Sequence, residues 1–242
     1  MKRFLFFIYA LLLVNNIQAQ GAVEFDRLMR EYGLVNIQEL DYTILVDLKY
    51  TTEDNFVGRD MYGSLDKAYF ESEFATRIVH AQQILKQHHP EYTLLIYDAA
   101  RPISVQRAMR KCVEGTSLES FVADGTKGGR HNYGVAIDLT IATLDGTPLD
   151  MGTPFDDLTA ASSVKGTPDT DDASTRIPEV YKHYCEELAA KGVISHEAAR
   201  NRVLLIEVMY EAGLVPYRRE WWHFEELISM SSTRITYKLL DF

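Results

Sequence analysis

The sequence predicts a single α+β domain, built from a small, mostly antiparallel sheet with flanking helices. Of its 242 residues, 46% are apolar and 25% are charged, which is enough apolar material for a packed core. Segments with helical periodicity occur both early and late in the chain, around a few short runs typical of strands. No internal repeat and no Ser-, Pro- or Gly-rich linker divides the chain, so we expect one domain over residues 20–242.

The first 19 residues have the pattern of a secretory signal peptide. Lys2 and Arg3 form a basic start, an unbroken apolar run covers residues 4–14, and Ala19 is a plausible cleavage position. At a helical rise of ~1.5 Å per residue, that run covers only about half of a bilayer core, so an uncleaved anchor is the weaker interpretation. We therefore expect residues 1–19 to be removed. The mature chain should be periplasmic or secreted, with no membrane span.

The remaining elements of the N-terminal half follow from local patterns. Residues 43–50 are rich in branched side chains and predict a strand, whereas residues 51–66 are polar and predict a long loop of the kind that often serves function. Residues 68–89 carry an apolar stripe at helical spacing. A buried strand is expected over residues 93–97, and a helix over residues 103–113 directly after Pro102.

In the C-terminal half, residues 135–141 predict another buried strand. Residues 144–176 are rich in Gly, Pro, Asp, Thr and Ser and predict an irregular segment. Two helices are expected over residues 178–191 and 196–212, the second with Ser195 as its N-cap, and an aromatic strand over residues 221–224.

Composition excludes several classes of protein. The net charge of −10 argues against a nucleic-acid partner, and two cysteines are too few for a disulfide scaffold or an all-cysteine zinc site. Cys112 and Cys185 lie far apart in helix-like segments. An oxidising compartment permits a disulfide between them, but two buried free thiols are an equally good interpretation.

Two of the seven histidines stand out. The other five lie in or at the ends of predicted helices and are interpreted as solvated: His80, His88, His89, His183 and His196. His131 precedes the buried strand that contains Asp138, an acid that needs an ion-pair partner or a metal in that setting. Their odd separation places them on opposite faces of a regular strand, so His131 must lie on the preceding loop, where Gly134 allows a bend.

Near the C-terminus, Glu220 and His223 are three residues apart. That gap requires Glu220 to lie at the strand entry or at a bulge if both side chains share a site. Two His and one Asp suit a zinc ion that keeps an open position for water, and a nearby Glu suits a general base. Asp138 could instead be the partner of a buried Arg. Arg101 ends another buried strand, either in a salt bridge, for example with Asp98, or as a donor to an oxyanion.

Five motifs together resemble one family, the D-alanyl-D-alanine dipeptidases, the VanX-like branch of the zinc D,D-peptidases (peptidase family M15). The resemblance runs from about Val46 to the end of the chain. Its motifs are Asp47-Leu48-Lys49-Tyr50 with Asp54-Asn55-Phe56, Asp98-Ala99-Ala100-Arg101-Pro102, His131-x-x-Gly134-x-Ala136-x-Asp138, Met151-Gly152-Thr153-Pro154-Phe155-Asp156, and Glu220-Trp221-Trp222-His223. The resemblance implies the hedgehog/DD-peptidase-like fold.

The resemblance also implies roles for single residues. His131, Asp138 and His223 would bind one zinc ion per chain, and Glu220 would take the proton of the attacking water. Arg101 would steady the tetrahedral intermediate. Asp156 matches the acid that holds the free ammonium group of the substrate, although a solvated loop acid is its simpler interpretation.

One departure concerns Gly129, which stands where the family usually has a substrate-contacting Ser. The exact dipeptide preference is therefore not carried over, unless the Gly129 N–H or the Arg130 side chain substitutes for the missing hydroxyl.

The favoured function is an exported zinc dipeptidase that hydrolyses the small substrate D-Ala-D-Ala. One alternative is a D,D- or L,D-carboxypeptidase acting on peptidoglycan peptides, and another is a non-catalytic module that binds wall peptides. Export favours recovery of dipeptide during wall turnover over a resistance role, and the sequence does not indicate an oligomeric state.

Overall fold

The computed structural model describes residues 24–166 and 176–242. The expected signal peptide lies outside the described residues, as do residues 167–175 of the expected irregular segment. In the part of the chain that is described, no helix has the length and apolar character needed to cross a bilayer.

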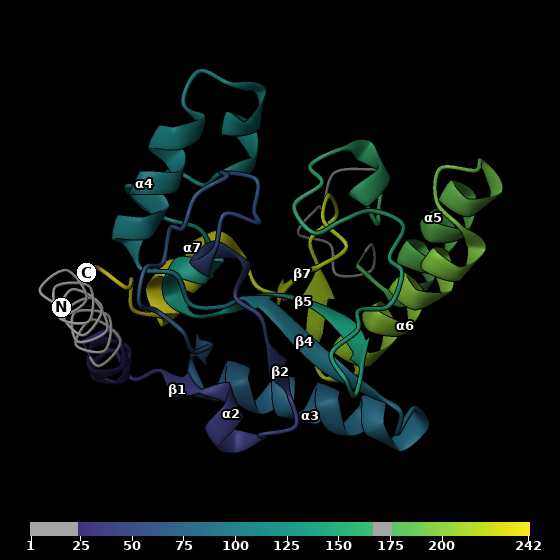
Figure 1. Ribbon diagram of the computed structural model, residues 1–242, viewed down its shortest axis with the longest axis horizontal. Coiled ribbons are helices and arrows are strands. Elements are labelled where there is room, and N and C mark those ends of the chain that lie inside the picture. Colours follow the sequence, from purple (N-terminus) through teal and green to yellow (C-terminus); the bar gives the residue numbers. More distant parts are fainter. Residues whose placement is uncertain (1–23, 167–175) are drawn as a thin grey trace, which may run out of the picture.

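The fold is α+β, as predicted, and its centre is a sheet with the strand order β2-β4-β5-β7-β6 (Figure 1). The strands are β2 (Leu45–Val46), β4 (Tyr92–Asp98), β5 (Ala136–Thr143), β7 (His223–Glu226) and β6 (Leu214–Pro216). Only the pairing of β2 with β4 is parallel among these strands, so the sheet is mostly antiparallel. Strands β4 and β5 are almost fully buried, because the sheet is covered on both faces.

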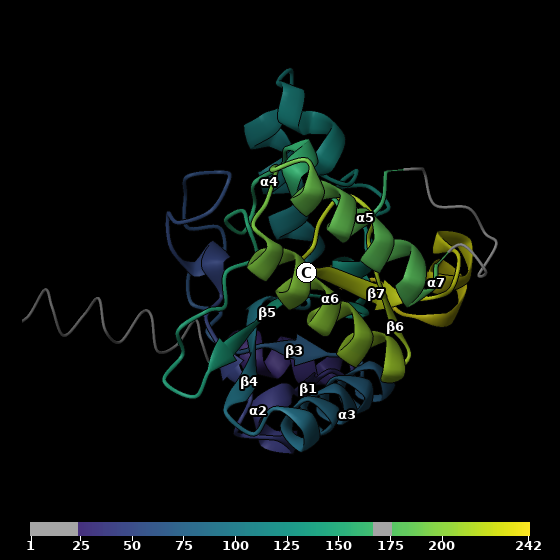
Figure 2. The same cartoon turned by 90° about the vertical axis from the view of Figure 1, so that its right-hand side faces the viewer.

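Two long helices cover the sheet. Helix α3 (Ser72–His88) packs along β4, and α6 (His196–Glu211) packs along β6, beside α3. Helix α5 (Pro178–Ala190) lies against α6 on its outer side, as Figure 2 shows. Helix α4 (Ile103–Val113) and the following 3-10 turn η2 (Ser117–Phe121) project away from these helices (Figure 1). The short helix α7 (Met230–Thr236) lies against the 3-10 turn η3 (Arg130–Tyr133).

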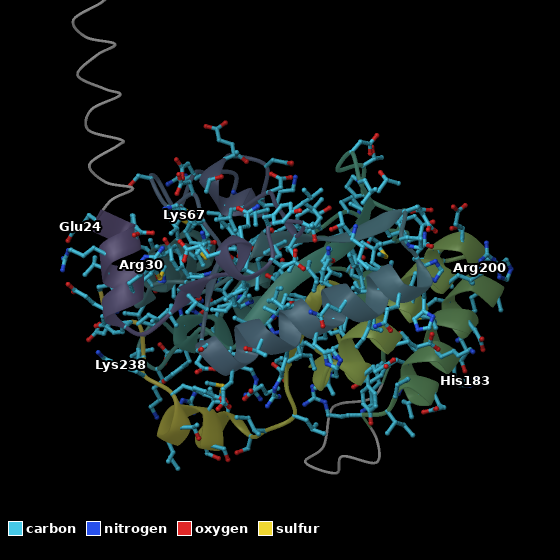
Figure 3. All side chains as sticks on the ribbon, turned by 90° about the horizontal axis from the view of Figure 1, so that it is seen from below. Glu24, Arg30, Lys67, His183, Arg200 and Lys238 are labelled. Carbon is cyan, nitrogen blue, oxygen red and sulfur yellow. The ribbon has the colours of Figure 1, made fainter. Side chains whose placement is uncertain are left out.

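The N-terminal part adds a small layer to this body. Residues 24–31 are helical, β1 (Val35–Asn36) pairs with β3 (Tyr69–Phe70), and α2 (Ile37–Leu40) follows β1. Charged side chains such as Glu24 and Arg30 point outward here, while His183 and Arg200 do so at the far end of the molecule (Figure 3). The solvated interpretation of His183 is therefore confirmed.

The structure corrects three of the predicted elements. The helix expected from residue 68 begins only at Ser72, because the Glu71 carboxylate caps it by accepting hydrogen bonds from the N–H groups of Glu73 and Phe74. The strand expected over residues 43–50 is reduced to two residues, and the chain then turns so that Tyr50 packs in the core. The last strand begins at His223 rather than Trp221. Strand β6 and helix α7 were not predicted, because no local pattern marks them.

Both cysteines are free. Cys185 is buried in α5, as one interpretation expected, but Cys112 is exposed on α4. The remaining histidines that were interpreted as solvated are exposed or half-buried: His80, His88, His89 and His196.

Candidate active site

Three side chains of the site are aligned across neighbouring strands. Asp98, at the end of β4, lies opposite Asp138 in β5, and Asp138 lies opposite His223, the first residue of β7. Directly opposed residues of adjacent strands point to the same face of a sheet. The pairing register therefore gathers these three side chains on one face.

His131 reaches this group from a loop, as its spacing from Asp138 predicted. It lies in the 3-10 turn η3 (Arg130–Tyr133), which ends at Gly134 with a left-handed φ of 72°. A Cβ at Gly134 would approach Leu34 Cδ2 to 2.9 Å, so the turn requires glycine. The Nδ1 atom of His131 lies 2.8 Å from the Ala99 carbonyl oxygen. Nε2 is thereby directed toward Asp138 and His223.

The three expected metal ligands converge. The Nδ1 atom of His223 lies 2.9 Å from Asp138 Oδ1 and 3.2 Å from His131 Nε2, and the third edge, His131 Nε2 to Asp138 Oδ1, measures 3.4 Å. All three ligand atoms lie within 4.8 Å of one another, and this group could hold a metal ion. The structure therefore brings together the three side chains that the sequence predicted as ligands.

Electrostatics in this cluster favour a positive charge at its centre. Burial acts to raise the pKa of Asp138, but the neighbouring imidazoles of His131 and His223 outweigh it and hold that pKa far below its usual value. Burial acts to lower the pKa of His223, but hydrogen bonds to Asp138 and Glu225 raise it to about 10. An arrangement that stabilises protonated imidazole in this way also suits a cation held by the same atoms.

Glu220 lies in the turn before β7, which is the first of the two positions, strand entry or bulge, that the three-residue gap allowed. Its carbonyl oxygen accepts a hydrogen bond from the His223 N–H, and its carboxylate Oε2 lies 4.0 Å from His223 Nδ1. The side chain is only 14% exposed, and burial raises the pKa of Glu220 to about 7. A carboxyl group with that pKa can both accept and release a proton near neutral pH.

Asp156 comes to the site from the irregular segment. Its backbone is left-handed, with a φ of 61°. The Tyr50 hydroxyl donates to Oδ1 at 3.2 Å, and the Phe56 N–H donates to Oδ2 at 3.3 Å. No Lys, Arg or His side chain pairs with it among residues 24–166 and 176–242. Burial, together with the charge of Asp138, raises its pKa well above the usual value, which does not fit a solvated loop acid.

Arg101 forms the salt bridge with Asp98 that one interpretation expected, and it also lines the cleft, so its role as an oxyanion donor stays a prediction. The guanidinium pairs with Asp98, and Nη1 donates to Gln106 Oε1 at 2.9 Å. It also lies over the Tyr50 ring, 5.1 Å from the ring centroid. Despite these contacts Arg101 is part of the wall of the cleft described next.

One cleft of about 340 Å³ lies at the centre of the site. Its lining includes every residue that the sequence assigned to the site: Arg101, His131, Asp138, Asp156, Glu220 and His223. Sequence reasoning missed Tyr50, Gln106 and Glu225, which also line the cleft. Tyr50 was within a recognised motif, whereas nothing in the local pattern marked the other two.

Gly129 also lines the cleft, and neither proposed replacement for the family's Ser is free. The Gly129 N–H donates to Asn132 Oδ1 at 2.8 Å, and the Arg130 guanidinium is bound to Glu225 and Thr233. A Cβ at Gly129 would lie 3.2 Å from the Ala123 Cβ. This part of the wall therefore offers no free hydrogen-bond donor in place of the Ser hydroxyl, and little room for a side chain at position 129.

Comparison with known proteins identifies similar chains. The family model described as D-ala-D-ala dipeptidase, Peptidase_M15, matches residues 30–176 and 186–237, which is most of the chain. Among curated proteins, a D-alanyl-D-alanine dipeptidase of Escherichia coli (strain K12) is 29% identical over 79% of this chain and 83% of its own length. A D-alanyl-D-alanine dipeptidase of Enterococcus faecium is 27% identical over 80% of this chain and 91% of its own length. A D-alanyl-D-alanine dipeptidase of Enterococcus faecalis (strain ATCC 700802 / V583) is 27% identical over 81% of this chain and 92% of its own length.

Proposed function

Because the chain belongs to peptidase family M15, the D-Ala-D-Ala dipeptidases, we propose that it is an exported zinc dipeptidase that hydrolyses D-Ala-D-Ala to two molecules of D-alanine. The observation that carries the proposal is the position of Asp156. A buried carboxylate without a cationic partner among the described residues opens into the same cleft as the three clustered ligands. Such a carboxylate suits a substrate that supplies its own ammonium group.

The ligand cluster fits zinc in chemistry and in size. Zinc prefers imidazole nitrogen and carboxylate oxygen at about 2.0–2.2 Å, and tetrahedral ligands at that radius lie about 3.3 Å apart. The three edges of 2.9, 3.2 and 3.4 Å among His131, Asp138 and His223 are close to this separation. When bound, zinc would polarise the substrate carbonyl and lower the pKa of a water molecule to about 7.

Glu220 is the proposed general base and general acid. Its carboxylate is close enough to His223 to reach a water molecule at the ligand cluster. It would accept a proton from the attacking water and then donate that proton to the nitrogen of the leaving D-alanine. A pKa of about 7 suits both transfers, because the group is present in both protonation states near neutral pH.

Asp156 would select for a free N-terminus. Its two donors, the Tyr50 hydroxyl and the Phe56 N–H, hold the carboxylate in one orientation without neutralising it. With the ammonium group bound there, only the first peptide bond of the substrate reaches the ligand cluster. This constraint supports a dipeptidase over a carboxypeptidase, whose substrate has a long chain before the scissile bond.

Arg101 is proposed to stabilise the oxyanion that develops on the scissile carbonyl. Its pairing with Asp98 and its bond to Gln106 fix the plane of the guanidinium. A donor that is already oriented costs no reorganisation when charge develops on the substrate.

Hydrolysis of D-Ala-D-Ala by purified residues 20–242, with and without a chelator, tests the proposal. We expect release of D-alanine that stops with the chelator and returns with added zinc. Removal of terminal D-alanine from a wall pentapeptide, without cleavage of the dipeptide, would instead establish a carboxypeptidase. Binding of wall peptides without turnover would establish a non-catalytic module. Export is tested separately, by N-terminal sequencing of the protein recovered outside the cytoplasm, with residue 20 expected at the start.

A further inference from the structure

Glu225 contacts the far side of the His223 ring. The two residues are separated by two positions in β7, so their side chains lie on the same face of the strand. Glu225 Oε2 lies 3.5 Å from His223 Nε2, whereas His223 Nδ1 faces Asp138. The imidazole is therefore held between two carboxylates, one at each ring nitrogen.

The Glu225 carboxylate is itself fixed by two guanidinium groups. Arg130 Nε donates to Oε2 at 2.6 Å, and Arg176 Nη2 donates to Oε1 at 3.2 Å. The Glu225 side chain is 10% exposed, and the side chains of the two arginines are about as deeply buried. Arg130 also donates to Thr233 Oγ1 at 2.5 Å and to the Ile228 carbonyl at 2.7 Å. The carboxylate thus has a defined position before any ligand is bound.

The same ion pair joins the two segments that carry the histidines. Arg130 is the neighbour of His131 in η3, and Glu225 follows His223 in β7. Each end of the Arg130–Glu225 pair is thus one or two residues from a histidine of the cluster. A change in this pair should alter the distance between the two imidazoles.

We propose that Glu225 is a positioning residue, which orients the His223 imidazole for metal binding and, through Arg130, holds the η3 and β7 segments at the spacing that the metal requires. The proposal rests on the zinc site of the proposed function. Carboxylates that accept the second N–H of a ligand histidine fix its tautomer and raise its basicity, and their loss typically weakens metal binding by about 10–100-fold.

Glu226 provides a matched control. It is adjacent in β7, is also buried, and also has charged and polar partners, with Arg77 Nη1 at 3.4 Å and the Tyr237 hydroxyl at 2.7 Å. Because successive side chains of a strand alternate, Glu226 points to the face opposite His223. If losing a buried carboxylate from β7 acts only by destabilising the fold, replacement of Glu225 and replacement of Glu226 should therefore have the same effect.

The test measures zinc affinity rather than turnover. Metal-free protein is titrated with zinc in competition with a chromophoric chelator, for the unmodified chain, Glu225→Gln and Glu226→Gln. We expect Glu225→Gln to bind zinc about 10–100-fold more weakly and Glu226→Gln to bind it within about twofold of the unmodified chain. Thermal unfolding of the metal-free proteins should show destabilisation in both variants. Equal zinc affinity in folded Glu225→Gln and the unmodified chain would overturn the proposal.

A second variant keeps the test decisive if Glu225→Gln does not fold. Glu225→Asp retains the negative charge for Arg130 and Arg176, but its shorter side chain loses contact with His223. We expect it to fold and still to bind zinc more weakly, and unchanged affinity would again overturn the positioning role. Failure of the proposed function has a different signature, because the unmodified chain would then bind no zinc or would bind it without cleaving D-Ala-D-Ala.

Discussion

Removal of the charge at Asp156 should selectively impair cleavage of the free dipeptide. The variant Asp156→Asn retains size and, because Asn tolerates left-handed backbone as Asp does, it retains the φ of 61° without added strain. Its amide oxygen can still accept the hydrogen bond from the Phe56 N–H, and its NH2 group can donate to the Tyr50 hydroxyl oxygen, which then accepts instead of donating. The change therefore removes charge and little else.

The size of the effect follows from the environment of the carboxylate. An ammonium nitrogen about 3 Å from a carboxylate oxygen interacts by roughly 5–6 kcal/mol at an effective dielectric constant of 20. Stripping water from the ammonium group offsets part of this, which leaves a net loss on the order of 3–5 kcal/mol when one partner of the buried pair is removed. At 1.36 kcal/mol per tenfold, kcat/KM for D-Ala-D-Ala should fall by about 150-fold to 5,000-fold.

The assay compares D-Ala-D-Ala with N-acetyl-D-Ala-D-Ala, which lacks the ammonium charge. The unmodified enzyme should strongly prefer the free dipeptide, and Asp156→Asn should narrow that preference. Asp157→Asn is the matched control, since Asp157 binds the Thr159 N–H and lies outside the lining of the cleft, and it should behave like the unmodified enzyme. Equal kcat/KM for the two substrates in the unmodified enzyme would refute the ammonium-binding role and favour a carboxypeptidase.

Three further variants test the remaining site residues. His223→Ala leaves two protein ligands, too few for a catalytic zinc site, so metal analysis should find zinc lost, and full occupancy would contradict the assignment. Glu220→Gln should keep zinc and fold but lose about 10²–10⁴-fold in turnover, the usual contribution of a general base, whereas near-normal turnover would make Glu220 structural. Arg101→Lys replaces a planar fork of donors by a point charge, so turnover should fall by about 10²–10³-fold. A lower melting temperature at unchanged turnover would restrict Arg101 to its salt bridge with Asp98.

Local pattern was sufficient to predict the long helices and the buried strands. The helix over residues 103–113 was predicted with the bounds of α4, and the Ser195 cap of α6 is confirmed by its bond from the Ala198 N–H. These features depend on side-chain periodicity and capping chemistry, which involve neighbours in sequence. The short strands β1, β2 and β3 were missed or misjudged in extent, because two-residue strands depend on a distant partner rather than on their own propensity.

The residues of the candidate site likewise divide into those whose position follows from local spacing and those whose position depends on distant partners. Spacing alone placed His131 on a loop and Glu220 at a strand entry or a bulge, since a period of two residues forbids a regular strand that would bring them to the same site as Asp138 and His223. Spacing could not show that Arg101 pairs with Asp98 and also lines the cleft, because both interpretations are consistent with one stretch of sequence.

The sequence by itself thus determined which residues could carry the chemistry, their local conformation and the family to which the chain belongs. Only the tertiary structure decided that Asp156 meets Tyr50, 106 positions earlier in the chain, and that Glu225 pairs with Arg130, 95 positions away. The physical reason is that periodicity and capping are set by near neighbours. The surroundings of a buried charge are set by strand register and loop packing, which are determined by burial and hydrogen bonding over the whole chain.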